Sequence, residues 1–409
     1  MITFNRNEAV YVVGRVAFLF SRPLFLLVAN QFFGNGVAAL IAAAFLVSAM
    51  LLTLLAVDSH RIYYARHFGT LGENAAFGFS RHVFSQAILS IVGVTLCIGY
   101  FGFMEGKWFA AAAAALFFVT EKLADEILRF TLFERARALW GWLMIRRLVP
   151  QFLMFGCIVL IAPASSAAGP LLILALASGN LFSFVPRVPG AAIYRLTKHT
   201  RSLLLHGSAA LRLILGSGQL WALSLAAAFS SYNDRLIVLF AKKENLAIFT
   251  LLIVSLSMIQ NAVEYFYLSQ KRRDILEGKV NFLKVISSKS YIFIVLFSTL
   301  FGILTAFANI YFYKDAPDVP VVLFFFIAVS QISLATTLVA REVVYWNNQI
   351  KAALKVEVTY LSIITTSFLA LSFLEMGYLW LLAAAASALI VRLVMFAKIV
   401  PERAPIKFS

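Results

Sequence analysis

Residues Phe229 to Lys243, FSSYNDRLIVLFAKK, are the stretch from which the fold can be read. The segment is apolar toward both ends and carries Asn233, Asp234 and Arg235 near its middle, so it predicts a membrane-crossing helix with a charged centre. A charged side chain at mid-bilayer costs about 2.5 to 3.5 kcal/mol on insertion scales, so it faces protein or a water-filled cavity. Arg235 therefore needs an anionic partner, in the protein or in a substrate.

The composition of the whole chain agrees with a membrane setting. Of the 409 residues, 62% are hydrophobic and 13% charged, and the mean hydropathy is +0.88. Apolar runs of about 20 residues recur, and each is long enough for a helix to cross about 30 Å of hydrocarbon. The runs lack the alternation of a membrane β-barrel. The sequence therefore predicts an all-α polytopic membrane protein.

The charges between the apolar runs indicate an orientation. Basic residues gather after every second run, whereas the other turns hold only four of the 35 lysines and arginines, which are Lys107, Lys242, Lys243 and Lys314. By the positive-inside rule, both termini are cytoplasmic, and the net charge of +16 needs no nucleic-acid partner. Twelve spans are predicted, at 10–32, 36–57, 83–103, 108–130, 148–163, 169–188, 217–241, 246–268, 290–312, 319–339, 356–374 and 377–398.

Short matches between the two halves suggest an internal repeat. Three pairs follow one another in the same order at offsets of 213, 206 and 216: SRPLFLLVA from Ser21 with DRLIVLFAK from Asp234, AVD from Ala56 with AVE from Ala262, and ADE from Ala124 with ARE from Ala340. Because six spans separate equivalent positions, the halves share one topology. The prediction is two pseudo-symmetric six-helix bundles, residues 1–205 and 206–409.

The repeat pairs Arg22 with Arg235, and Arg15 lies about two helical turns before Arg22. One interpretation is a cationic wall in a central cavity that binds phosphate or pyrophosphate, with Asn233 and Asp234 beside it. The other is structural: Arg235 pairs with Asp234 or with another helix, and Arg15 extends to the membrane interface.

A second group of charges lies at the cytoplasmic ends of the spans. Asp58 and Glu264 lie at the cytoplasmic ends of spans 2 and 8. One interpretation is that they form ion pairs between the two halves and so close the cytoplasmic side of the cavity. The other is that they are solvated helix ends. The end of span 4 is crowded with charges at i, i+4 spacing, such as Lys122 with Glu126, which favours pairing within one helix over a proton or cation relay. The candidate gate residues are Asp58, Glu264, Glu126, Arg341 and Glu342. Between spans 4 and 5, residues 131–147 mix arginine with tryptophan and predict a helix in the membrane interface.

Two segments carry a resemblance to a known family. They are GRVAFLFSRPLFLLVANQFFGNGVAALIAAAFLVSAMLLTLLAVDSHRIYYARHF from Gly14 and FSSYNDRLIVLFAKKENLAIFTLLIVSLSMIQNAVEYFYLSQKRR from Phe229. In each, a first helix ends in a short polar turn, and a second helix runs to a charged cytoplasmic end. In layout and in these segments, the chain resembles the flippases of the multidrug/oligosaccharidyl-lipid/polysaccharide (MOP) superfamily, in particular the Wzx-type polysaccharide or O-antigen branch.

The resemblance implies a flippase in the bacterial inner membrane that moves an undecaprenyl-pyrophosphate-linked oligosaccharide. It implies a cavity between spans 1, 2, 7 and 8, and two bundles that open to each side in turn. The partners would be the lipid-linked oligosaccharide, the bilayer and the polysaccharide polymerase machinery, without nucleic acid. The sequence indicates no cofactor and leaves coupling to protons or sodium open.

Three other functions remain as alternatives. A cation-coupled multidrug exporter of the MATE branch needs an acidic cavity, but span 1 has arginines and no carboxylate. A membrane-embedded glycan polymerase or glycosyltransferase usually needs a large external loop, and the external turns are short. A non-transporting scaffold has no reason to keep costly charges in the membrane. The sequence shows no nucleotide-binding loop and no zinc-ligand cluster, so transport is favoured over catalysis.

Overall fold

The computed structural model describes residues 6–56, 73–133, 137–161, 167–183, 218–241, 245–268, 282–314, 321–346, 349–374 and 377–399. Throughout these ranges the chain is helical apart from short turns, and no strand occurs in them. The prediction of an all-α protein is confirmed. The chain forms two compact units, Met1–Ser224 and Leu225–Ser409. The expected boundary at residues 205 and 206 lies outside the described residues.

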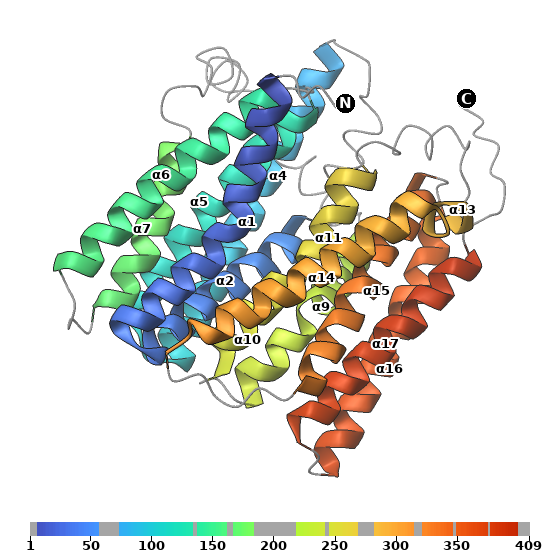
Figure 1. Cartoon of the computed structure of the whole chain (residues 1–409). Coiled ribbons are helices and arrows are strands. Elements are labelled where there is room, and N and C mark those ends of the chain that lie inside the picture. The colour runs from blue at the N-terminus through green and yellow to red at the C-terminus, as the bar shows by residue number, and fades with distance from the viewer. Residues whose placement is uncertain are drawn as a thin grey trace. The chain divides into compact units, whose positions relative to one another are not determined.

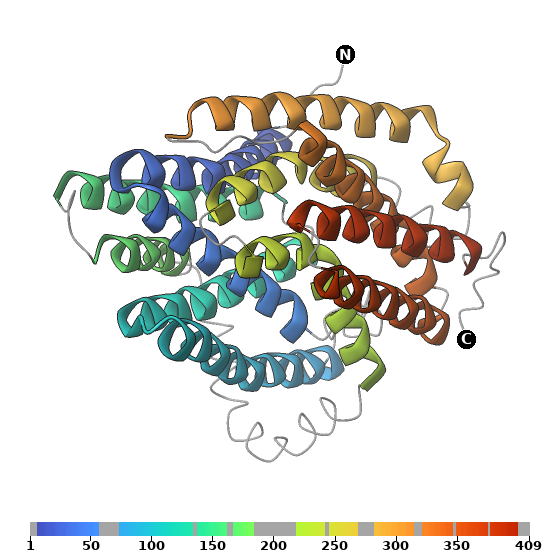
Figure 2. The ribbon, with the colours of Figure 1, turned by 90° about the horizontal axis from the view of Figure 1, so that it is seen from below.

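Unit 1 is a layered helical bundle (Figure 1). Helices α1 and α6, α6 and α7, α5 and α7, and α4 and α5 pack against each other, and the last pair lies side by side in Figure 2. The elements are α1 (Arg6–Phe33), α2 (Asn35–Ala56), α4 (Glu73–Ile98), the π-helix η1 (Gly99–Met104), α5 (Trp108–Phe133), α6 (Arg137–Ile161), α7 (Ala168–Phe182) and the start of α9 (Gly218–Ala241).

The α1–α2 turn depends on a glycine conformation. Gly34 has φ of +81°, in the left-handed region that a side chain disfavours. Its backbone N–H donates to the carbonyl oxygen of Asn30 at 2.9 Å and so satisfies one of the last acceptors of α1. The chain then enters α2 at Asn35 without a longer loop.

Two glycines bring the backbones of α1 and α6 into direct contact. A Cβ atom on Gly14 would lie 2.8 Å from the carbonyl oxygen of Gly141, and one on Gly141 would lie 2.4 Å from that of Val10. Small residues allow such close approach in membrane helices, where dispersion contacts replace the hydrophobic drive. The same seam carries the Trp140 ring, 1% exposed, against Tyr11 with ring centroids 5.2 Å apart.

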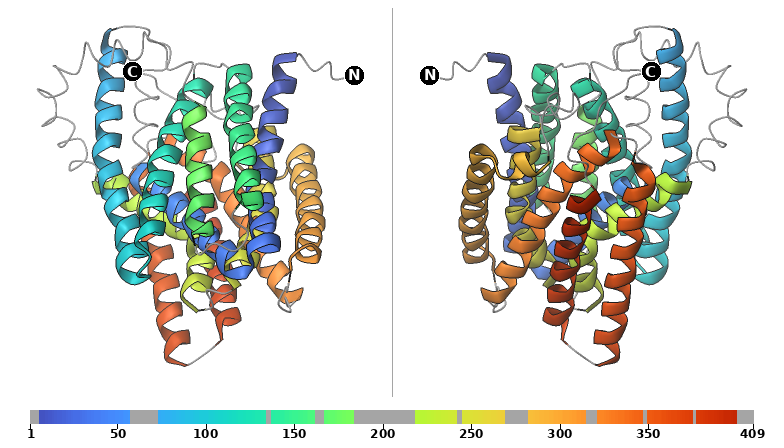
Figure 3. Two further views of the ribbon diagram at one scale, coloured as in Figure 1. Left: turned by 90° about the vertical axis from the view of Figure 1, so that its left-hand side faces the viewer. Right: turned by 90° about the vertical axis from the view of Figure 1, so that its right-hand side faces the viewer.

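Unit 2 has long helices packed in pairs. Helices α15 and α16 both contact α17, and α10 and α14 contact each other; α16 and α17 form the antiparallel pair at the C-terminal end in Figure 3. The elements are the rest of α9, α10 (Leu246–Leu256), α11 (Met258–Ala262), the π-helix η3 (Val263–Leu268), α13 (Phe282–Ile286), α14 (Lys289–Tyr311), α15 (Val321–Trp346), α16 (Ile350–Phe373) and α17 (Tyr378–Ile399).

The described residues hold nine helical stretches long and apolar enough to cross a membrane. They lie in α1, α2, α4 with η1, α6, the run from α10 to η3, α14, α15, α16 and α17. Helix α7 is apolar but shorter, and α5 and α9 are not among the nine. The chain is therefore a multi-pass membrane protein, and the division into twelve spans stays a prediction.

Three helices begin at least six residues earlier than the spans that the sequence indicated. Helix α4 starts at Glu73 instead of residue 83, α6 at Arg137 instead of residue 148, and α16 at Ile350 instead of residue 356. The expected interfacial helix at 131–147 is wrong, because α5 runs to Phe133 and the rest of the segment described by the structure belongs to α6. Trp140 of this segment packs on α1 and is buried, whereas Trp142 is 52% exposed.

The glycine seam predicts a strong difference between two alanine substitutions on α6. Gly141→Ala puts a methyl group where the backbone of α1 already lies, so we expect a loss of about 1 to 3 kcal/mol in the free energy of unfolding. Gly156→Ala is the control, because a Cβ atom there meets nothing within 4 Å. Thermal unfolding in detergent should show a lower Tm only for Gly141→Ala, and equal Tm values would contradict the seam.

Candidate functional site

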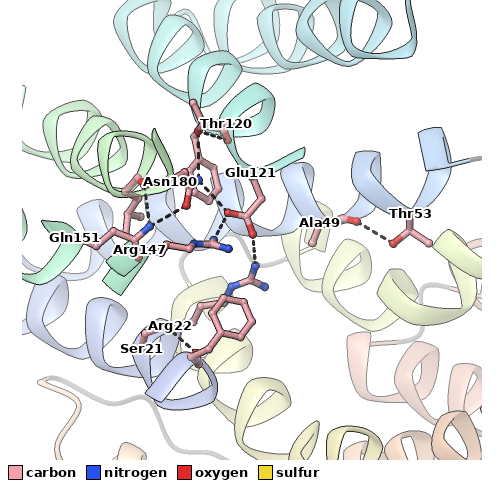
Figure 4. A network of polar contacts seen from close by, with 12 residues as sticks. Ser21, Arg22, Ala49, Thr53, Thr120, Glu121, Arg147, Gln151 and Asn180 are labelled. Atoms are coloured by element: carbon pink, nitrogen blue, oxygen red, sulfur yellow. Dashed lines mark hydrogen bonds and ion pairs between the residues drawn. The ribbon is translucent and has the colours of Figure 1, made fainter. Parts of the chain in front are cut away.

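The Glu121 carboxylate is the centre of a buried polar network in unit 1 (Figure 4). It lies on α5 and is 4% exposed. Its Oε1 accepts a hydrogen bond from Nη2 of Arg22 on α1 at 3.0 Å. Its Oε2 accepts from Nη2 of Arg147 on α6 and from Nδ2 of Asn180 on α7 at 3.1 Å. One carboxylate therefore connects four helices.

Further polar side chains fix the position of Asn180. Its Nδ2 also donates to Oγ1 of Thr120 at 3.2 Å, and its Oδ1 accepts from Nε2 of Gln151 at 3.0 Å. Gln151 in turn donates to the carbonyl oxygen of Leu176 at 2.8 Å. Gly179 leaves room for this contact, since a Cβ atom there would lie 2.0 Å from Cγ of Gln151.

The three charged members of the network differ in exposure. The side chains of Glu121 and Arg147 are 5% and 6% exposed, whereas that of Arg22 is 28% exposed. Two guanidinium groups face one carboxylate, so the three side chains together carry one net positive charge. Arg22 is therefore the accessible end of a buried, positively charged network.

Arg15 lies in an aromatic cluster on the α1–α6 seam. Its guanidinium carbon is 3.6 Å from the ring centroid of Trp140, and its Nε donates to the hydroxyl of Tyr11 at 3.3 Å. Leu143 and Met144 pack around the same ring. A cation stacked on an aromatic face is stabilised by the ring quadrupole. Arg15 is thus held mainly by aromatic rings, whereas Arg22 also has a carboxylate partner in Glu121.

The charged centre of the quoted segment pairs locally in α9. Nε of Arg235 lies 3.7 Å from Oδ1 of Asp234, Nη2 of Arg235 donates to the carbonyl oxygen of Ser231 at 2.9 Å, and Tyr232 lies under the guanidinium at 4.6 Å. Asn233 donates to the hydroxyl of Tyr360 on α16 at 2.9 Å. These contacts match the structural interpretation of Asp234 and Arg235, in which the two residues neutralise each other.

Unit 2 contains a buried ion pair that the sequence analysis missed. Nε and Nη2 of Arg392 on α17 donate to Oε2 and Oε1 of Glu357 on α16 at 2.8 and 2.5 Å. The two side chains are 1% and 0% exposed. Tyr360 and Phe396 flank the guanidinium at 5.2 and 5.5 Å. The signal was present, because each residue is an ionisable group inside an expected span.

The expected gate residues have different outcomes. Asp58 lies outside the described residues, and Glu342 lies in α15 with a side chain that is not described. Glu264 is exposed in η3, Glu126 is half-buried in α5, and Arg341 in α15 is 8% exposed. The gate itself stays a prediction.

The sequence predicts that the charges at the end of span 4 pair within their own helix, and for Glu121, one of these charges, the prediction is wrong. Glu121 pairs with arginines of two other helices and not within α5. A carboxylate in an apolar bundle is stabilised best by charged donors that are buried with it, and neighbours on the same helix cannot surround it.

Two further observations concern ligands and relatives. In the part of the chain that the structure describes, no group of three or more histidine, cysteine, aspartate or glutamate side chains is placed to hold a metal ion. Comparison of the chain with protein-family models, curated proteins and solved structures finds no match.

The buried pair in unit 2 predicts a non-additive mutant cycle. Arg392→Met alone leaves the Glu357 carboxylate buried without its partner, which should lower the free energy of unfolding by about 3 to 5 kcal/mol. Glu357→Gln together with Arg392→Met removes both charges and should recover most of that loss. Denaturant unfolding of the single and double variants in detergent measures the coupling, and strictly additive losses would disprove it.

Proposed function

We propose that the protein is a flippase for an anionic lipid-linked oligosaccharide, an undecaprenyl-pyrophosphate-linked unit of a surface polysaccharide. The observation that carries the proposal is the network around Glu121, whose accessible member is a cation. A transporter of a diphosphate headgroup needs such a charge within the membrane, where it attracts the anion and replaces its hydration. The resemblance of the two quoted segments to the Wzx-type branch supports the same conclusion.

The proposal includes the architecture and location that the function requires. The twelve predicted helices form two six-helix bundles in the bacterial inner membrane, with both termini in the cytoplasm. Helices α5, α7 and α9 then also cross the membrane, and their polar side chains face other helices of the protein. The bundles expose the headgroup site to each side in turn, while the lipid tails stay in the bilayer. The polysaccharide polymerase machinery receives the product.

The charge arrangement disfavours a cation-coupled multidrug exporter. Such a protein offers a carboxylate to its cargo, but the buried Glu121 carboxylate already accepts hydrogen bonds from two guanidinium groups. The carboxylate of Asp234 is likewise paired with its neighbour Arg235. Both acids are therefore paired with arginine, and the charge left over around Glu121 is positive, which favours an anionic cargo.

The proposal predicts that export depends on the charge of Arg22. In cells whose surface polysaccharide requires this protein, Arg22→Ala should lower glycan export about tenfold or more, because a charge-assisted contact with the headgroup is lost. Arg22→Lys should retain part of the activity. Lipid-linked oligosaccharide should accumulate in the inner leaflet for the alanine variant.

Lys107→Ala is the matched control. It removes one positive charge from the turn between η1 and α5, where Lys107 pairs with Glu105 at 3.7 Å and is 52% exposed. Immunoblotting of membranes confirms equal amounts of each variant. Normal export by Arg22→Ala would overturn the proposal, and equal defects in Arg22→Ala and Lys107→Ala would show that only total charge matters.

A further inference from the structure

Glu121 occupies a position where an oxyanion of a substrate could bind. Two guanidinium groups and one amide converge on its carboxylate, and that donor set is also suited to a phosphate oxygen. The anion bound there in this structure is the protein's own side chain. We infer that Glu121 is a displaceable counter-ion. It binds Arg22 in the empty transporter, and a phosphate group of the substrate replaces it as the partner of Arg22.

The exposure of the partners shows which contact is exchanged. Arg147 and Glu121 are both nearly inaccessible, with side chains 6% and 5% exposed, so their contact stays closed to a ligand. Arg22 is 28% exposed and meets the carboxylate through one nitrogen. When the ligand takes Arg22, the Glu121 charge remains balanced by Arg147. The exchange therefore leaves no buried charge alone.

The surroundings of Arg22 leave donors for a ligand. Among the described residues its guanidinium donates one hydrogen bond, the one to Glu121. The rings of Phe18 and Phe45 lie 5.5 and 5.4 Å from its central carbon. Aromatic contacts hold a guanidinium without using its N–H groups. A guanidinium has five such groups in a planar fork, which fits a phosphate in two-point contact.

The competition gives Glu121 a role in release as well as binding. Without an internal anion to compete for it, Arg22 would hold a diphosphate tightly and slow its departure. With Glu121 present, every bound anion must displace an internal hydrogen bond, so affinity is lower and release is faster. A transport site has to bind its substrate tightly enough to load it and weakly enough to release it.

This inference rests on the proposed function for its substrate, but its test uses a simpler probe. Binding of inorganic pyrophosphate to the purified full-length chain in lipid nanodiscs is measured by calorimetry at fixed salt. Glu121→Gln should bind pyrophosphate about tenfold or more tightly than wild type, because one amide oxygen cannot fully serve both guanidinium groups. Glu121→Gln combined with Arg22→Ala should lose that gain.

Glu105→Gln is the control, since it removes the same charge from the exposed turn that holds Lys107. Its affinity should equal that of wild type. Glu121→Asp is the second variant: it keeps a negative charge next to Arg147 but shortens the reach to Arg22, so it should also bind more tightly. Thermal unfolding of each sample establishes that the compared proteins are folded.

The outcomes separate this inference from the proposed function. Unchanged or weaker pyrophosphate binding in folded Glu121→Gln or Glu121→Asp overturns the counter-ion role, even if glycan export depends on Arg22. Tighter binding that persists without Arg22 also overturns it. Tighter binding that requires Arg22 supports it, even in a protein that fails to export lipid-linked glycan.

Discussion

The contact of one buried carboxylate with two guanidinium groups is the constraint on which unit 1 depends. Glu121 is inaccessible, and its charge is tolerated because α6 delivers the equally buried Arg147, and α7 delivers Asn180, to its Oε2, while α1 brings Arg22 to its Oε1. Arg147 is the partner that this carboxylate needs at all times, because low-dielectric surroundings penalise a buried charge without a counter-charge. The network therefore ties four helices together through one carboxylate.

Unit 2 neutralises its charges by a more local arrangement. Glu357 and Arg392 form a closed two-point pair on adjacent helices, and Asp234 and Arg235 pair along one helix. The offset from Arg147 to Glu357 is 210 and that from Asn180 to Arg392 is 212, close to the offsets of the short sequence matches. Similar positions thus carry polar groups in both halves. Among the networks described, only the one around Glu121 has more guanidinium groups than carboxylates, and the side chain of one of its arginines, Arg22, is 28% exposed.

The class of the protein followed from the sequence because apolar run length is a local property. The helix starts did not, because two adjacent arginines such as Arg146 and Arg147 indicate the end of a span, although Arg147 is buried within α6. The partner of Glu121 was missed for a related reason. Spacing within one helix predicts i, i+4 pairs, whereas Arg22 lies 99 residues away in sequence. Tertiary contacts over such separations leave no periodic pattern.

The glycines explain why these distant groups can meet at all. Gly141 brings α6 against α1, and Gly179 brings α7 against α6, where its Cβ position is 2.7 Å from the carbonyl oxygen of Arg147. Helix α6 is therefore held closely on two sides, and Arg147 and Gln151 project from it one turn apart. With these backbones fixed, the long side chain of Arg22 is the part of the network with rotational freedom. Release of Glu121 then requires rotation of one partly exposed side chain, without separation of the α1–α6 seam, and such rotation is fast compared with helix movement.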